Sequence, residues 1–180
     1  LTAGGQGYLA WKQWMLTRFR SDAGEETGVQ LYLRSALSGQ VFRPMAEGKA
    51  RFESGGVSFS AEWERIRLSL ACCCAPLSAA AVMRLTMENT GKENRELDAV
   101  TYLEPALSSQ QDDRAHPNYR DLSVRVAPWN SKGLVARRLP RDARDRAPLL
   151  ALFALGEYDT LRRQGDRALF LGRLGTCRMP

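Results

Sequence analysis

The chain has 180 residues, of which 44% are hydrophobic and 26% are charged, a balance typical of a folded globular protein and not of a disordered one. Its 26 Lys and Arg against 20 Asp and Glu give a formal net charge of +6. These cations are spread along the chain, which argues against a nucleic-acid-binding surface. The longest apolar stretch, residues 71–83, is broken by Pro76 and Ser78 and is shorter than the roughly 20 residues of a membrane-spanning helix, so this segment is not expected to insert into a membrane.

Most of the chain alternates apolar and polar residues with a period of two, which predicts β-strands. The expected strands are residues 29–34, 41–43, 57–63, 65–70, 81–87, 95–103, 122–126 and 134–137, separated by turns such as 38–39, 89–92 and 128–133. Residues 8–20 and 147–155 fit either a helix or a strand. We therefore expect an all-β fold, an antiparallel β-sandwich with one or two short helices at most.

The length of the chain suits a single domain covering residues 1–180. Because the sequence opens at Leu1 and not at a methionine, we expect this domain to be excised from a longer multidomain chain.

The cysteines do not suggest a metal site. Cys72, Cys73 and Cys74 are consecutive, so on a strand they point to alternating faces and cannot converge on one ion, and Cys177 stands alone. We interpret the triplet as small apolar strand residues, with Cys73 opposite its neighbours. No cofactor is expected.

A catalytic site would depend on the single histidine, His116. Asp113 could orient its ring, and Ser108 or Ser109 could serve as nucleophile, but no G-x-S-x-G motif is present. A loop histidine that fixes a turn before Pro117 is the simpler interpretation. The acidic pairs and the Gly4–Gly7 segment give only weak signals, and we interpret the latter as a flexible lead-in. The basic run at residues 137–146 is interpreted as a solvated loop.

An aromatic cluster near the start is more informative. Tyr8, Trp11 and Trp14 lie close together in sequence, interleaved with cations that include Arg18 and Arg20. Sugar rings stack their apolar faces on Trp and Tyr, while Arg and Asp bind the hydroxyls. On a strand Trp11 and Trp14 face opposite sides, so at most one of them is expected in the core.

Several motifs occur in the order of a known family. They are Gly7-Tyr8 with Trp11, residues 17–20, residues 31–34 with Ser38-Gly39, residues 84–86 with Asn89, residues 100–104, residues 115–119, residues 137–141 and residues 166–173. This ordered set resembles the N-terminal β-sandwich domain of glycoside hydrolase family 94, formerly glycosyltransferase family 36. That domain is a galactose-mutarotase-like supersandwich. Residues 115–117 and 166–173 are most similar to cyclic β-1,2-glucan synthases. Leu9, Phe19 and Ser35 depart from the family pattern.

The resemblance implies a role without catalysis in these residues, because the catalytic acid of the family lies in an (α/α)6 barrel that follows the sandwich. It implies carbohydrate binding, with a β-glucan oligosaccharide, the adjacent barrel and a second copy in a homodimer as partners. It also implies a bacterial protein, with this segment soluble on the cytoplasmic side and an inner-membrane parent chain. A purely structural packing or dimerisation domain without sugar affinity is the alternative, and an enzyme using His116 and Asp113 is a third hypothesis.

The candidate carbohydrate-binding or interface residues form two groups. Tyr8, Trp11, Trp14, Arg18 and Arg20 form the first, with the aromatic rings stacking on sugar and the arginines binding hydroxyls or the carboxylates of a partner. Asp113 and His116 form the second, on a loop.

Overall fold

The structure is a computed structural model that describes residues 1–19, 28–115, 122–140, 142–146, 148–173, 175 and 177. These residues form antiparallel sheets, which confirms the predicted all-β class. Three short helices are found among them, where at most two were expected. The chain divides into two compact units: unit 1 comprises Leu1–Tyr8 and Thr27–Leu103, and unit 2 comprises Leu9–Glu26 and Glu104–Pro180. That residues 1–180 form one excised domain stays a prediction.

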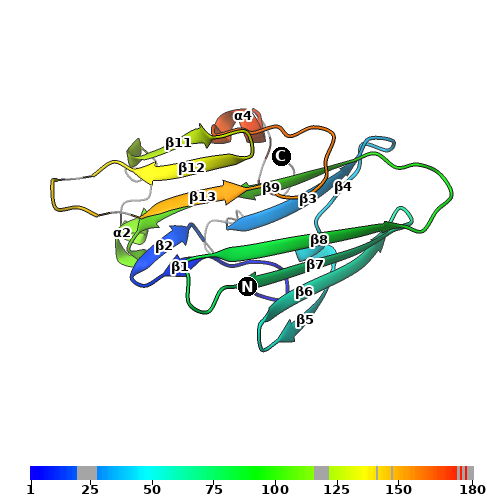
Figure 1. The fold of residues 1–180 in the computed structure, drawn as a ribbon, viewed down its shortest axis with the longest axis horizontal. Coiled ribbons are helices and arrows are strands. Elements are labelled where there is room, and N and C mark those ends of the chain that lie inside the picture. Colours follow the sequence, from blue (N-terminus) through cyan, green and yellow to red (C-terminus); the bar gives the residue numbers. More distant parts are fainter. Residues whose placement is uncertain are drawn as a thin grey trace. The chain divides into compact units, whose positions relative to one another are not determined.

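Unit 1 contains two antiparallel sheets (Figure 1). The first has the order β4-β3-β9, with strands β3 (Val29–Ser35), β4 (Val41–Phe42) and β9 (Leu97–Leu103). The second has the order β5-β6-β7-β8, with strands β5 (Lys49–Glu53), β6 (Gly56–Trp63), β7 (Ile66–Cys74) and β8 (Ala81–Asn89). The short helix α1 (Pro44–Glu47) follows β4. The expected hairpin at residues 29–43 and the strands predicted between residues 57 and 103 are confirmed, whereas β5 was not predicted.

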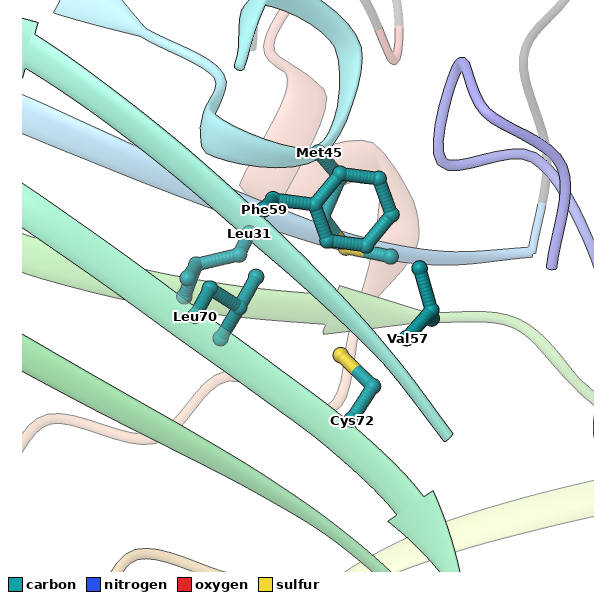
Figure 2. Close-up of a cluster of buried hydrophobic side chains, with 6 residues drawn as sticks. All are labelled: Leu31, Met45, Val57, Phe59, Leu70 and Cys72. Atoms are coloured by element: carbon teal, nitrogen blue, oxygen red, sulfur yellow. The ribbon is translucent and has the colours of Figure 1, made fainter. Parts of the chain in front are cut away.

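The core of unit 1 is apolar and follows from the period of two. Along β7, Ile66, Leu68, Leu70 and Cys72 are buried while the residues between them are half-buried or exposed. Figure 2 shows one buried cluster, in which Leu70 and Cys72 of β7 meet side chains from β3, β6 and α1. Its members are Leu31, Met45, Val57, Phe59, Leu70 and Cys72. A second cluster joins the two sheets and consists of Leu33, Phe42, Ile66 and Leu68. Together these clusters make unit 1 a sandwich.

The cysteine triplet behaves as expected. Cys72 is buried and points into the cluster in Figure 2, whereas its neighbour Cys73 is exposed, as is Cys74 at the end of β7. Burial raises the pKa of the Cys72 thiol to about 11, because a thiolate is poorly solvated there. The thiol of Cys72 is therefore a core group and not a reactive one.

The glycine-rich start of the chain is packed and not a flexible lead-in. Gly5 is buried, with φ +76°, and a Cβ at this position would lie 2.4 Å from Cβ of Met45. Gln6 is held by Thr2, whose hydroxyl accepts a hydrogen bond from the Gln6 amide at 3.1 Å. The glycine is needed because the backbone approaches α1 more closely than any side chain allows.

Unit 2, like unit 1, contains two sheets, and in unit 2 each sheet has three strands (Figure 1). The first has the order β1-β2-β10, with strands β1 (Ala10–Trp11), β2 (Trp14–Thr17) and β10 (Pro105–Ser108). The second has the order β11-β12-β13, with strands β11 (Val124–Trp129), β12 (Gly133–Arg138) and β13 (Leu149–Phe153). Strand β10 packs against all three strands of the second sheet. Helices α2 (Gln110–Ala115) and α4 (Arg167–Leu171) complete the unit.

The two ambiguous segments of the sequence are strands. Within residues 8–19 the chain forms the β1-β2 hairpin, and within residues 148–155 it forms β13. Neither carries a helix. None of the described helices is long and apolar enough to cross a membrane.

Candidate functional site

The two tryptophans of the aromatic cluster face each other across a hairpin. Trp11 ends β1, Trp14 begins β2, and the two residues are direct cross-strand partners. The chain reverses over Lys12 and Gln13, with Lys12 at φ 54°. Because cross-strand partners project to the same side of a sheet, the expectation that the two indoles face opposite sides is wrong. Both residues are half-buried.

A buried arginine lies on Trp14. The guanidinium of Arg138, from β12, is 5.3 Å from the centre of the Trp14 ring, a cation–π contact. The same guanidinium forms an ion pair with Asp145, and the exposed fractions of the two side chains are only 2% and 13%. This charged residue therefore ties the hairpin to the second sheet of unit 2.

A second buried ion pair joins β2 to α2. Arg18, directly after β2, donates from Nη2 and Nε to Oδ1 of Asp113 at 2.8 and 3.1 Å, and Nε also lies 3.3 Å from Oδ2. The two side chains are 3% and 5% exposed. The guanidinium and the carboxylate thus satisfy each other inside unit 2, and this geometry favours a role in positioning the hairpin and the helix.

Helix α2 begins with a capping interaction that uses one of the candidate nucleophiles. The hydroxyl of Ser109 accepts a hydrogen bond from the amide of Asp112 at 3.1 Å. Ser108 is fully buried in β10. Ser109 is therefore engaged as a helix cap, and Ser108 has no access to solvent.

Helix α4 gives a physical reason for the motif at residues 166–173. The carboxylate of Asp166 caps its start by accepting from the amides of Ala168 and Leu169, at 2.8 and 3.2 Å. Arg167 donates from Nε to Glu104 at 2.8 Å, which ties the helix to the residue before β10. Gly172 ends the helix. The motif is a capped helix with one anchoring ion pair.

The predicted site residues separate into three sets. Trp11, Trp14, Arg18 and Asp113 all belong to unit 2, and the structure brings Asp113 to Arg18. Tyr8 belongs to unit 1 and is 45% exposed. Arg20 and His116 lie outside the described residues, so the predicted pairing of Asp113 with His116 stays untested.

The sequence interpretation missed Arg138 and Asp145. The run at residues 137–146 was interpreted as a solvated loop, which agrees with the exposed Arg144 but is wrong for Arg137 and Arg138, because both lie on strand β12 and Arg138 is buried. A signal was present, because Arg138 follows strict alternation from Ala136 along β12 and so points to the buried face.

This arrangement restricts the chemistry of the described residues. Among them no group of three or more His, Cys, Asp or Glu is placed to hold a metal ion. The buried carboxylate of Asp113 is already held by a cation. What the site offers to a ligand is a half-buried indole pair on a hairpin that two ion pairs hold in place.

Comparisons with known proteins agree with this architecture. The family model described as the glycosyl hydrolase 94 supersandwich domain matches residues 1–180. The chain is also 26% identical over 189 aligned positions to the cyclic beta-(1,2)-glucan synthase NdvB of Rhizobium meliloti (strain 1021). That alignment covers 96% of this chain but only 7% of the relative, so the chain spans a small part of that protein's length. The chain belongs to the glycosyl hydrolase 94 supersandwich domain family.

Proposed function

We propose that the chain is a non-catalytic carbohydrate-binding domain that acts together with a following (α/α)6 catalytic domain on β-glucan. The membership of the family and the likeness to a cyclic beta-(1,2)-glucan synthase support a β-glucan synthase or β-glucoside phosphorylase as the parent protein. A bacterial parent at the inner membrane, with this domain on its cytoplasmic side, is part of the same proposal.

The paired indoles of Trp11 and Trp14 are the observation that carries the proposal. One ring, Trp14, is fixed by the guanidinium of Arg138, and its partner Trp11 lies directly across the hairpin. An aromatic surface that is already fixed before binding loses little conformational entropy when a sugar stacks on it. We therefore assign the sugar contact to Trp11, with Trp14 as its support. Tyr8, in unit 1, stays a separate candidate for contact with sugar.

Arg18 and Asp113 do not contact the sugar in this proposal. Their side chains are buried against each other, so we assign them to positioning β2 and α2 and not to contact with sugar hydroxyls. Arg20 and His116 keep their proposed contacts with sugar or with the partner domain.

A packing or dimerisation role is the second candidate function. It is favoured by large apolar side chains on the surface of unit 2, of which Leu149 and Leu155 are 68% and 84% exposed. This role predicts a dimer or a complex with the barrel, and no affinity for sugar.

Calorimetric titration of the 180-residue chain with linear β-1,2-gluco-oligosaccharides, and with cello-oligosaccharides for comparison, tests the proposal. We expect saturable binding of one linkage, and about fivefold weaker binding by Trp11→Ala, since an aromatic stacking contact is worth about 1 kcal/mol. Phe52→Ala is the matched control, because Phe52 is an exposed aromatic residue of unit 1. The absence of heat with either sugar, from a folded sample that forms dimers, would favour the packing role instead.

A further inference from the structure

The sheet β11-β12-β13 carries two aromatic rings on its outer face. Trp129 ends β11, Phe153 ends β13, and both are registered with Gly133 on the central strand. The ring centres are 5.2 Å apart with an angle of 51° between the planes. The two residues are 50% and 42% exposed, so the rings form an accessible surface instead of a core contact.

Gly133 lets this surface form. A Cβ at this position would lie 2.6 Å from Cδ1 and 2.7 Å from Cε1 of Phe153, and Gly133 itself is buried. The phenyl ring therefore covers the backbone of the central strand, where any side chain would push it away. The result is a continuous aromatic platform, defined here as Trp129 and Phe153 over Gly133.

The same face continues from the platform along the strands. Two residues further along each strand lie Ala127, Val135 and Ala151, and two further again lie Arg125, Arg137 and Leu149. The first three are small, and Val135 is the only half-buried one among them. From Trp129 to Arg125 the strand rises about 13 Å, which is long enough for more than one sugar ring. This face, called the track from here on, leads from the aromatic rings to the arginines.

The opposite face of this sheet belongs to the core of unit 2. Ala136 and Arg138 point to that side and are buried. Exposure of the platform is thus not a sign of a poorly packed sheet, because the alternation along β12 separates a buried face from an exposed one.

Polar groups lie at both ends of the track. At the platform end, Asn130 accepts from the Lys132 amide at 2.9 Å and, through its carbonyl, from the Arg163 guanidinium. These bonds hold the β11-β12 turn that supports Trp129. At the other end Arg137 is exposed, and none of the described residues forms an ion pair with it. Its guanidinium is available to bind hydroxyl groups.

We propose that Trp129 and Phe153 form a second saccharide-binding surface, on which a glucan chain stacks its sugar faces while Arg137 binds its hydroxyls. Aromatic rings, small side chains and an exposed guanidinium suit a ligand with apolar faces and hydroxyl edges. This inference rests on the proposed function for the identity of the ligand, but it uses residues that the first site does not.

The test is titration of linear β-1,2-gluco-oligosaccharides into wild-type chain, Trp129→Ala, Trp129→Phe and Phe153→Ala, with Trp11→Ala and Phe52→Ala in parallel. We expect about tenfold weaker binding by Trp129→Ala and Phe153→Ala, with partial recovery in Trp129→Phe. Tryptophan fluorescence gives a second readout: we expect quenching or a blue shift on binding to wild-type chain that is lost in Trp129→Phe, because the other three tryptophans are the same in both proteins.

The outcomes separate the two sites. Affinity that is unchanged in Trp129→Ala and lost in Trp11→Ala overturns this inference and leaves the proposed function intact. No binding by the folded wild-type chain overturns both. A wild-type dimer that becomes monomeric in Trp129→Ala, with sugar affinity unchanged, shows that the platform is a protein interface and also overturns the inference.

Discussion

The two units of the chain have cores of different chemistry. The buried clusters of unit 1 consist of apolar side chains such as Leu33, Phe59 and Leu70. In unit 2 the buried residues include Thr17, Ser108 and both members of the Arg18–Asp113 pair, together with Arg138. Unit 1 is thus held mainly by burial of apolar surface, whereas unit 2 depends on buried charges that must remain paired.

The difference bears on function because both proposed sugar surfaces lie in unit 2. Apolar packing tolerates substitutions that keep the volume of the core, whereas a buried ion pair allows few geometries. The charged core fixes the hairpin that carries Trp11, while the sheet that carries Trp129 shares Arg138 with it. We infer that the unit whose core contains paired charges is the one that presents these aromatic rings.

Breaking the buried pair is expected to have the largest effect. Asp113→Ala removes the carboxylate that the buried Arg18 guanidinium pairs with and should lower the free energy of unfolding by about 3–5 kcal/mol in urea denaturation. The matched control is Asp98→Ala, which breaks the ion pair between Arg34 and Asp98. Because these two side chains are 61% and 53% exposed, this variant should lose less than about 1 kcal/mol of stability. The double variant Arg18→Met/Asp113→Leu should recover most of the loss. Equal losses for the exposed and the buried pair would contradict the account of unit 2.

A cavity in unit 1 should give the next largest effect. Leu70→Ala removes a side chain that is only 1% exposed and should cost about 3 kcal/mol. Leu77→Ala is the control, because that side chain is 96% exposed and should change stability by less than about 0.5 kcal/mol. If urea denaturation shows only a small loss of stability for Leu70→Ala, the cluster in Figure 2 is not a main source of the stability of unit 1.

Alkaline pH should weaken unit 1 through Cys72. Its pKa is raised by burial to about 11 from a reference value of 9.0, so the unfolded chain loses the proton first. The protonated Cys72 thiol contributes fully to the stability of the folded chain below pH 9. The free energy of unfolding should fall by about 2 kcal/mol as the pH rises from 9 to 11. Denaturation of wild type and Cys72→Val across this range measures the difference, with the exposed Cys73→Ala as control. A wild-type curve parallel to that of Cys72→Val would count against a buried thiol.

Loss of a helix cap in unit 2 should have the smallest effect. Asp166→Ala removes the acceptor for two amides at the start of α4 and should cost about 1 kcal/mol. Asp159→Ala, in an exposed loop, is the control and should be close to neutral. A shift in melting temperature of the same size for both variants would show that the carboxylate of Asp166 does not cap α4.

Much of unit 1 could be predicted from the sequence because each strand has one buried and one exposed face. The period of two along β7 indicates both the strand and the core residues from Ile66 to Cys72. Strand β5 escaped prediction because it lies at a sheet edge and is mostly exposed, so its pattern is weak. The β1-β2 hairpin escaped because its turn, Lys12-Gln13, lacks the Gly or Asn that typically marks such a reversal.

The site was harder to predict than the fold. Arg18 and Asp113 were both candidates, but they are 95 residues apart, and only the folded chain brings them together. The platform of Trp129 and Phe153 was missed for the same reason, since strands β11 and β13 meet only through β12. The residue types in the sequence therefore indicated that aromatic and charged surfaces exist. Only the tertiary structure shows which residues lie together on the same surface.

Mapping of sugar binding onto the four tryptophan indoles tests the central claim most directly. In an NMR titration of the 180-residue chain with linear β-1,2-gluco-oligosaccharides, each indole N–H gives its own signal. We predict that the signals of Trp11 and Trp129 in unit 2 shift on binding. The signal of Trp63 in unit 1, which stacks on Phe42 at 5.5 Å, should stay in place. Shifts of Trp63 alone, or of no indole in a folded sample at saturating sugar, would contradict the assignment of carbohydrate binding to unit 2.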